Sequence, residues 1–285
     1  MGANLRVVTL NLWGTEAPLD RRLSLALVQL RELAPDVICL QEVRPLDGRS
    51  GRTTADFLAE GLGMSAHYAA AVTWDDGAHP KLSAGQEGLA IIAKQIIDTA
   101  VLPLPHPRPI DARLLLSAQV ATDGSPIWIH TTHLHYRLDD GVAREDQVVA
   151  VDEAIRARRT DTSPPQILCG DFNATPDSDE IRFLRGLTTL AGRRTHFQDA
   201  WLRTHPSDVG ITWSSENRLT RPLRSLDIDR RIDYIFVTSR KKDGRGTIHS
   251  CEVALTERDG SDDETSICAS DHYAVVADIQ VVSNA

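Results

Sequence analysis

The sequence predicts a sheet-rich α/β or α+β domain in which helices enclose two layers of β-sheet. Two observations predict this class. Short apolar runs outnumber the segments with helical periodicity, and the helical segments are spread along the chain. The 285 residues are enough for one large hydrophobic core, and no Pro- or Gly-rich linker divides them. We therefore expect a single domain over residues 1–285.

The first half of the chain contains one clear helix among several strands. Leu23, Leu27 and Leu30 recur at helical spacing, which predicts a helix over 19–33, and Pro35 ends it. Apolar runs predict strands at residues 5–10, 37–40, 88–93, 114–120 and 127–134. The polar segments 44–54 and 73–86 are expected to be surface loops.

The second half has a similar mixture of elements. A helix is predicted over 142–158 and a short one over 176–187, where Asp177 and Glu180 have the spacing of a capping box. Strands are predicted at residues 166–169, 213, 232–237, 253–255 and 274–281. The polar segments 214–230 and 257–270 are expected to be loops, and loops of that length often carry function.

The charge balance and the apolar runs restrict the classes of partner. Lys and Arg number 31 and Asp and Glu 40, a net charge of −9, which disfavours nucleic acid as a partner without excluding a local basic groove. No apolar run reaches the length of a membrane span, so we expect no stable membrane association. The first residues lack the apolar core of a signal peptide, so we expect a cytoplasmic protein. A disulfide between Cys251 and Cys268 is disfavoured in that compartment, although the sequence leaves it open.

Polar side chains stand where several apolar strands begin or end. They are Asn11, Glu42, His133, Asp171, Asn173, Asp233, Asp271 and His272. Strand ends at one edge of a sheet can meet in space, and converging carboxylates repel one another unless a cation lies among them or their pKa values shift. Carboxylate and amide oxygens are hard ligands that suit Mg²⁺ or Mn²⁺ better than zinc. The pattern predicts a site for one of these cations.

Seven segments, in this order, resemble the endonuclease/exonuclease/phosphatase family. They span almost the whole chain and are Thr9–Trp13, Leu40–Val43, Glu87–Ile91, Thr132–Leu134, Gly170–Asn173, Arg231–Phe236 and Ser270–His272. The family includes pancreatic-type deoxyribonucleases, abasic-site endonucleases, deadenylases, inositol polyphosphate phosphatases and neutral sphingomyelinases. The resemblance implies a four-layer α/β sandwich, with two central mixed β-sheets flanked by helices, and metal-dependent hydrolysis of a phosphate ester.

The resemblance also implies roles for the polar strand ends. Glu42 resembles the main metal ligand, with Asn11 beside it and Asp271 on the opposite side of the ion. Asp171 and Asn173 resemble the pair that orients or deprotonates the attacking water.

Two His–acid pairs complete the implied machinery. Asp233 resembles the acid that fixes the imidazole of His272 against the phosphate, and His133 with Glu87 resembles a pair beside the leaving group. Mechanisms in the family differ on whether the aspartate or the histidine is the general base. We favour Asp171 as the base, with His272 as the group that stabilises the transition state.

Three arginines are candidates for substrate binding. Arg113 precedes a strand at a position where the family often has an arginine that faces the phosphate. Arg221 and Arg224 lie in the polar segment 214–230, where a solvated surface loop is the alternative interpretation.

The leading functional hypothesis is a Mg²⁺-dependent hydrolase that acts on a phosphodiester in a small molecule, nucleotide or lipid headgroup. The alternatives are a metal-dependent nuclease acting on DNA or RNA and a non-catalytic binding module on the same fold. Abasic-site endonucleases carry an additional acid two residues after the asparagine, where this chain has Trp13. The sequence leaves open which phosphate ester is the substrate, whether it is a diester or a monoester, and whether the site binds one metal ion or two.

Overall fold

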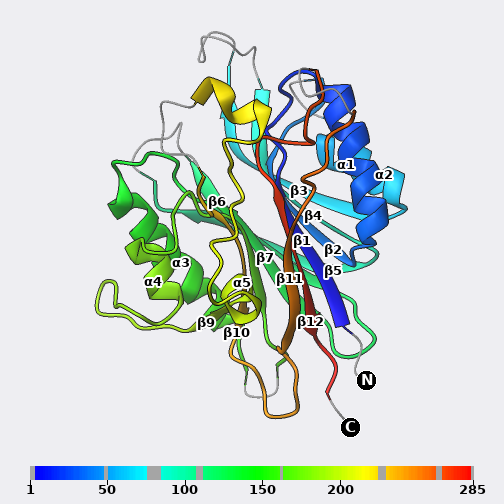
Figure 1. Cartoon of the computed structure of the whole chain (residues 1–285). Coiled ribbons are helices and arrows are strands. Elements are labelled where there is room, and N and C mark those ends of the chain that lie inside the picture. Colours follow the sequence, from blue (N-terminus) through cyan, green and yellow to red (C-terminus); the bar gives the residue numbers. More distant parts are fainter. Residues whose placement is uncertain are drawn as a thin grey trace.

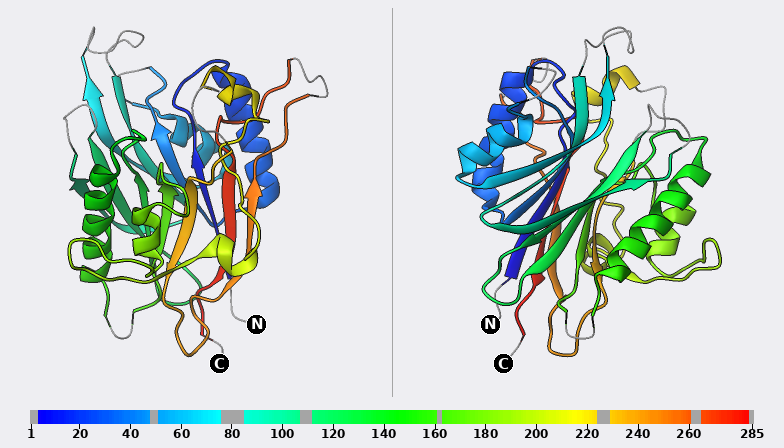
Figure 2. Two further views of the ribbon diagram at one scale, coloured as in Figure 1. Left: turned by 60° about the vertical axis from the view of Figure 1, so that its left-hand side comes forward. Right: turned by 180° about the vertical axis from the view of Figure 1, so that it is seen from behind.

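The computed structural model describes residues 4–47, 51–75, 85–106, 112–160, 163–223, 229–260 and 265–283. In this part of the chain, two six-stranded mixed sheets pack face to face (Figure 1). Figure 2 shows the layers: helices α1 and α2 cover the outer face of one sheet, and α3 and α4 cover the outer face of the other. The predicted four-layer α/β sandwich is confirmed.

The first sheet has the strand order β11–β12–β1–β2–β4–β3. Its strands are β1 (Asn4–Asn11), β2 (Val37–Val43), β3 (Ser65–Trp74), β4 (Gly85–Ala93), β11 (Ile248–Ala254) and β12 (Ala274–Gln280). Because β1 and β2 are parallel, Asn11 and Glu42 come to the same edge of the sheet. Strand β12 is antiparallel to β1, so the Asp271–His272 pair that precedes β12 lies at this edge as well.

The second sheet has the order β5–β6–β7–β8–β10–β9. Its strands are β5 (Ile96–Leu104), β6 (Arg113–Val120), β7 (Ile127–His133), β8 (Ile167–Asp171), β9 (Phe197–Asp199) and β10 (Asp233–Thr238). The pairing register places Asp171 beside His133 on one neighbouring strand and beside Asp233 on the other. Three of the predicted site residues therefore form one row across this sheet.

Each helical layer closes a separate part of the core. The helices are α1 (Leu19–Leu33), α2 (Thr54–Leu62), α3 (Gly141–Ala157), α4 (Asp179–Leu184) and α5 (Ala200–Thr204), with a 3₁₀ helix at Arg218–Leu223. One apolar cluster lies between the sheets, a second beneath α1 and α2, and a third beneath α3 and α4. The central strands are buried on both faces, which explains why they appear in the sequence as continuous apolar runs.

One polar contact crosses the apolar space between the sheets. The fully buried Gln41 on β2 donates from Nε2 to Oγ1 of Thr131 on β7, at 2.9 Å. The same nitrogen lies 3.2 Å from Oγ1 of Thr9 on β1. This contact joins the two sheets directly beside Glu42.

Some elements differ from those predicted. Strands β3, β5 and β9 and helices α2 and α5 were missed. The three strands are edge strands, α2 begins inside a polar segment, and β9 and α5 are only three and five residues long. Helix α2 starts with a capping box between Thr53 and Asp56. The capping box predicted for Asp177 and Glu180 is not formed, because Ser178 is the N-cap and Glu180 pairs with the buried Arg144.

The structure describes parts of the predicted loops and all of the cysteines. Segments 48–50, 76–84, 224–228 and 261–264 of the expected loops lie outside the described residues. Trp213 makes only an isolated bridge, to Arg230. Cys251 and Cys268 are both buried and free. None of the helices in the described ranges is long and apolar enough to span a membrane.

We predict that Gly170→Ala destabilises the fold. Gly170 has a φ of 148°, and a Cβ there would lie 2.0 Å from the carbonyl oxygen of Thr132 on β7. The strands would have to separate, at a cost of about 1–3 kcal/mol in the free energy of unfolding. Urea denaturation measures this loss. Gly141→Ala is the matched control, because its Cβ would meet only the tip of Arg144 at 3.7 Å, and it should leave stability unchanged or slightly raised. Equal stabilities of the two variants would contradict the prediction.

Candidate active site

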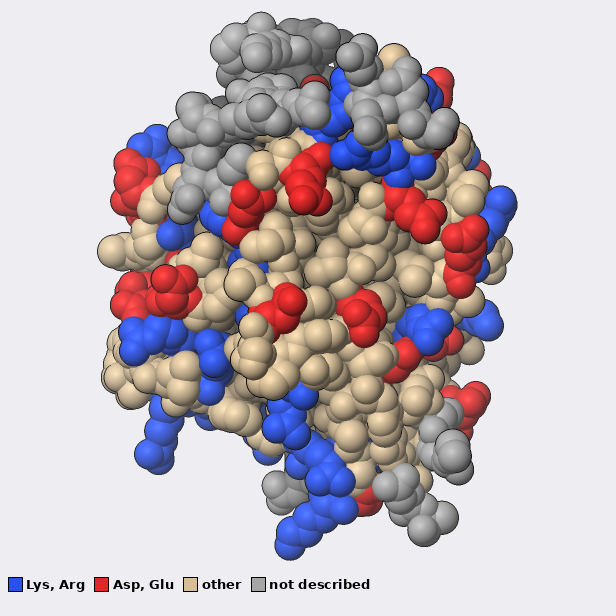
Figure 3. Space-filling view, viewed as in Figure 1, with Lys and Arg blue, Asp and Glu red and all other residues tan. Residues whose placement is uncertain are grey.

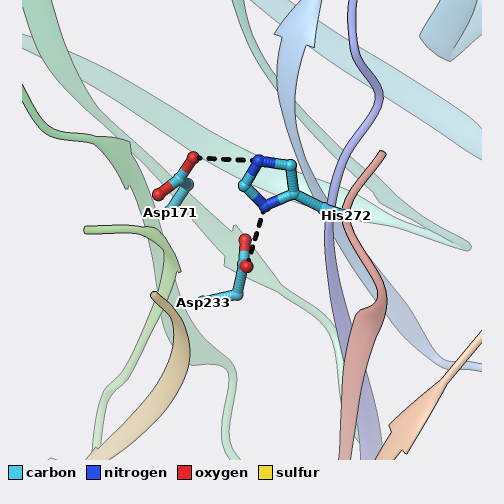
Figure 4. Close-up of side chains that lie close together, drawn as sticks. All are labelled: Asp171, Asp233 and His272. Atoms are coloured by element: carbon cyan, nitrogen blue, oxygen red, sulfur yellow. Dashed lines mark hydrogen bonds and ion pairs between the residues drawn. The ribbon is translucent and has the colours of Figure 1, made fainter. Parts of the chain in front are cut away.

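The predicted polar strand ends meet at one end of the sandwich, where the edges of the two sheets come together. Asn11, Asp171 and Asp233 are each 1% exposed, and Asp271 and His272 are each 6% exposed. Figure 4 shows His272 between Asp171 and Asp233, with one carboxylate facing each ring nitrogen. The first sheet contributes Asn11 and Glu42, and the second contributes Asp171 and Asp233.

Asn11 links the acids of the two sheets. Its Nδ2 donates to Oε1 of Glu42 at 3.0 Å and to Oδ2 of Asp171 at 3.1 Å. Its Oδ1 accepts the backbone N–H of Trp13 at 2.9 Å. The amide therefore faces the carboxylates with its nitrogen, and as a metal ligand it would have to present its oxygen instead.

Glu42 lies at an irregular point of its strand. Its φ is 52°, which non-glycine residues adopt rarely, and the pairing of β2 with β4 shifts register between Leu40 and Val43. Burial of the carboxyl, and next the charges of Glu87 and Asp271, raise the pKa of Glu42 to about 8. Strain and an unfavourable charge at one residue are typical of functional sites.

Asp171 is the centre of the cluster. Its Oδ1 accepts the backbone N–H of Asn173 at 2.8 Å, and its Oδ2 lies 3.4 Å from Nε2 of His133. Burial, followed by the charge of Asp233, raises the pKa of Asp171 to about 6. Asn173 has a φ of 48°, and its side chain donates to the carbonyl of Leu134 at 3.1 Å.

His272 lies between two acids that favour the charged form of its ring. Its Nδ1 lies 2.9 Å from Oδ2 of Asp233, and its Nε2 lies 3.8 Å from Oδ2 of Asp171. Burial opposes the charged ring, but Asp233, Asp271 and Asp171 together raise the pKa of His272 well above its usual value. Ligand atoms of Asp171, Asp233 and His272 lie within 4.8 Å of one another, so this trio is a candidate metal site. A protonated imidazole has no free lone pair for a metal. In that state the ring is hydrogen-bonded to Asp233 and forms an ion pair with Asp171.

His133 and Glu87 share no hydrogen bond in the described part of the chain. Glu87 instead accepts from Arg44, at 2.8 Å from Nε and 2.7 Å from Nη2. Burial, and next the charges of Arg113 and His272, hold the pKa of His133 well below its usual value. Glu87, Arg113 and His133 line one small cavity of about 10 Å³. The two residues predicted as a His–acid pair are therefore neighbours across this cavity.

Of the three arginines predicted to bind substrate, the structure places one at the candidate site. Arg113 begins β6, and its buried Nε has no hydrogen-bond partner among the described residues. Arg221 lies in the 3₁₀ helix Arg218–Leu223, where the structure describes its backbone. Arg224 lies outside the described residues.

Asp271 and its neighbours are fixed by residues that the sequence analysis missed. Ser270 donates from Oγ to the carbonyl of Asn11 at 2.6 Å. Asn217 donates from Nδ2 to the carbonyls of Ser270, at 2.8 Å, and Asp271, at 3.1 Å. Burial raises the pKa of Asp271. Asn217 lies far from these residues in the sequence, within a polar segment that carries no local signal of such a contact.

Arg22 is a second missed residue. Its guanidinium is fully buried and donates to the carbonyls of Leu12 at 2.7 Å, Glu16 at 2.7 Å and Ala269 at 3.3 Å. It thereby joins the segment after β1 to the segment before Asp271. Burial lowers the pKa of Arg22 to about 10. An arginine on an amphipathic helix normally reaches solvent, so its sequence position gave no indication of this role.

Comparisons with solved structures agree with this architecture. The structure of Danio rerio TDP2 complexed with a single-strand DNA product has a TM-score of 0.73 and 22% identity, covering 97% of this chain and 99% of that one. The human Nocturnin catalytic domain with bound sulfate has a TM-score of 0.69 and 19% identity, covering 99% and 97%. An endonuclease/exonuclease/phosphatase from Beutenbergia cavernae has a TM-score of 0.69 and 24% identity, covering 98% and 72%. At these identities the likeness concerns the fold.

The sequence was also compared with curated proteins and with family models. No curated protein matches it. The model of the Endonuclease/Exonuclease/phosphatase family matches residues 8–272, and every strand end of the cluster lies within that range. With this match, the two-sheet sandwich and the buried acids and histidine at its edge, the chain belongs to the endonuclease/exonuclease/phosphatase family and is a metal-dependent phosphoesterase.

Proposed function

We propose that the protein is a Mg²⁺-dependent phosphodiesterase for a small molecule, nucleotide or lipid headgroup. The observation that carries the proposal is the arrangement around Asn11, which brings the acids of both sheets to one point. Burial raises the pKa values of Glu42, Asp171 and Asp271, and repulsion by neighbouring carboxylates adds to the rise for Glu42 and Asp171, so the ionised acids are unfavourable without a positive charge. Hard oxygen donors under such repulsion fit a divalent cation such as Mg²⁺ or Mn²⁺.

Glu42, Asp271 and the amide oxygen of Asn11 are the residues that would hold Mg²⁺. When bound, the ion neutralises non-bridging phosphate oxygens and the charge that develops on the leaving oxygen. Arg113 has a buried Nε without a described partner beside His133, and it is placed to bind a phosphate oxygen there.

Asp171 is the proposed general base. A carboxylate with a pKa near 6 can accept a proton from water at neutral pH and is a stronger base than an ordinary aspartate. Asn173 fixes one oxygen of Asp171 through its backbone N–H. The other oxygen accepts from Asn11, and a water would have to share it with that amide.

His272 is the proposed stabiliser of the transition state. Its raised pKa favours the protonated ring, which supports a role as a charged donor to a phosphoryl oxygen rather than as the base. Asp233 accepts from Nδ1 and so leaves Nε2 as the donor that faces the phosphate. His133 stays neutral on the other side of Asp171, where it would donate to the leaving oxygen.

A loop that the sequence analysis overlooked favours a substrate with an apolar group near its phosphate. Tyr136 and Leu138, in the connection from β7 to α3, are 54% and 51% exposed, and they follow His133 closely. The buried Arg144 donates to the carbonyls of His135 and Arg137, which fixes the backbone that presents both side chains. Exposed apolar side chains on a segment that follows the leaving-group histidine would suit an aromatic or acyl substituent.

A nuclease is the alternative function. One structural neighbour, the TDP2 of Danio rerio, has been solved with a single-strand DNA product. The net charge of −9 disfavours a polyanionic substrate for this chain. A non-catalytic binding module is the third hypothesis, and measurable Mg²⁺-dependent turnover of a generic aryl phosphodiester would exclude it.

We predict that Mg²⁺ binding depends on pH through Glu42. Below the pKa of about 8 the carboxyl is protonated, so the ion must displace a proton, and affinity should fall as pH falls from 8 to 6. Glu42→Gln should weaken binding and flatten this dependence. It should leave the metal-free protein at least as stable at pH 8, because a raised pKa means that the charged form opposes folding. Titration calorimetry at several pH values measures both effects. Glu60→Gln, on the exposed face of α2, is the control, and unchanged Mg²⁺ binding in Glu42→Gln would refute the ligand assignment.

We predict that Asp171→Asn lowers kcat by about 10²–10⁴-fold with the fold intact, because the amide cannot accept the proton. The acid limb of the wild-type pH–rate profile should lie at or below pH 6, since a bound cation lowers the pKa of a nearby carboxyl. The exposed Asp179→Asn should retain full activity. Near-normal turnover in Asp171→Asn, with a larger loss in His272→Ala, would transfer the role of base to His272.

We predict a shallow salt dependence and weak DNA cleavage. A polyanion bound through many Lys and Arg contacts releases counterions, so its affinity falls steeply with salt. A small phosphodiester held by a metal ion and one or two arginines shows little of this effect. The value of kcat/KM should be compared for duplex DNA and an aryl phosphodiester at two salt concentrations with constant Mg²⁺. If DNA is cleaved at least as efficiently, with a steep salt slope, the nuclease alternative replaces the proposal.

A further inference from the structure

Two adjoining cavities lie beside the short edge strand β9, away from the catalytic cluster. Their volumes are about 390 and 420 Å³, and they share His196, Phe197 and Ser239 as walls. Each has the size of an ordinary small-molecule site. Strand β10 separates them from the catalytic centre, because it runs from Asp233 in the cluster to Thr238 in a cavity wall. Five residue steps along a strand span about 17 Å.

Arginines surround both cavities. Three line the first cavity and three the second: Arg185, Arg203 and Arg240, then Arg156, Arg159 and Arg194. Figure 3 shows Lys and Arg gathered, with few acids, over the lower part of this face, where β9, β10 and the connection to β11 lie. On a chain of net charge −9, such a concentration of one sign at a pair of cavities indicates an anionic ligand.

The two acids in the cavity walls neutralise one of these six arginines, Arg156, and leave the other five. Asp199 is occupied by the buried Arg231, which donates to both of its oxygens at 3.0 Å. Asp152 accepts from Arg156 at 2.7 Å and also from the hydroxyl of Thr195. Both carboxylates are therefore saturated by partners in the protein itself.

Three of the arginines are without a side-chain partner in the described part of the chain. The guanidinium groups of Arg159, Arg194 and Arg203 make no hydrogen bond or ion pair there, and all three side chains are exposed. Elsewhere on the described surface, arginines are commonly paired with acids, as in Arg6–Asp278, Arg21–Asp259, Arg52–Glu60, Arg137–Asp139 and Arg182–Asp179. The positive charge at the cavities is thus left for a ligand.

We propose that these cavities form a second anion-binding site for a small ligand with two or more phosphate groups. Guanidinium groups bind phosphate oxygens through paired hydrogen bonds, which a single carboxylate or an uncharged molecule cannot satisfy at both cavities. The two adjoining cavities, each with its own arginines, match a ligand whose charges are spread over several bonds. A chain of phosphates, free or attached to a nucleoside, has this shape and charge.

Titration calorimetry with inorganic tripolyphosphate tests the site. EDTA in the buffer keeps divalent cations from the catalytic centre. The pocket variants are Arg203→Gln with Arg240→Gln for the first cavity, and Arg159→Gln with Arg194→Gln for the second. Each double variant should weaken tripolyphosphate binding at least tenfold, while keeping the wild-type Tm and the wild-type Mg²⁺-dependent turnover of an aryl phosphodiester.

Two controls separate this site from other anion binding. Arg52→Gln with Arg182→Gln removes the same charge from exposed, paired positions and should change the affinity by less than twofold. Arg113→Gln should also retain binding, because Arg113 belongs to the catalytic centre. An ADP arm and an orthophosphate arm distinguish a nucleotide from free phosphate chains as the source.

Three results would overturn the proposal. The first is unchanged tripolyphosphate affinity in both pocket variants, and the second is an equal loss in the Arg52/Arg182 control. The third is binding of a penta-glutamate peptide or a short oligothymidine as tight as that of tripolyphosphate, which would identify the surface as a docking face for acidic protein or nucleic acid. None of these results depends on the catalytic activity, so the proposed function stands or falls separately.

Discussion

The hydrogen bonds of Asn11 are the interaction on which the rest of the site depends. Each sheet carries acids that would repel those of the other, and a neutral donor between Glu42 and Asp171 relieves this repulsion without adding a charge. Ser270 and Arg22 both act on the backbone at Asn11 and Leu12, and thereby hold the amide in place. The pKa values of Glu42, Asp171 and Asp271 stay raised, chiefly by burial, so their charged forms would be favoured by a cation.

The second sheet provides the other half of the site through strand register alone. His133, Asp171 and Asp233 are cross-strand neighbours on β7, β8 and β10, so one row of pairing places three of the candidate site residues together. The close approach of β7 and β8 at Gly170 makes this row compact. The histidine between the two carboxylates comes from the segment before β12 and is thus contributed by the first sheet.

The sequence predicted the parts of the site that carry a local signal. An acid or amide at the end of an apolar strand can be recognised from the sequence alone. This pattern identified Asn11, Glu42, Asp171, Asp233 and Asp271 as candidates. The supporting residues Arg22 and Asn217 act on backbone carbonyls distant in sequence, and no local pattern reports such contacts. Strands β3 and β5 were missed for a related reason, since edge strands face solvent and lose the continuous apolar run. The expected pairing of His133 with Glu87 required both side chains to point toward each other, which a sequence does not show. In the structure, Glu87 forms an ion pair with Arg44 instead.

Gln41 has a consequence for how the two halves of the site are aligned. Two apolar sheet faces can slide over one another with little change in buried area, because hydrophobic contact has no preferred direction. The hydrogen bond from Gln41 to Thr131 is satisfied in a single alignment, and sliding would break it while the bonds of Gln41 to Thr9 within its own sheet remain. A methionine of similar length would fill the same space yet accept several alignments. This hydrogen bond between the sheets lies one residue away from Glu42. It therefore favours one alignment of the sheets and, with it, one spacing of the acids.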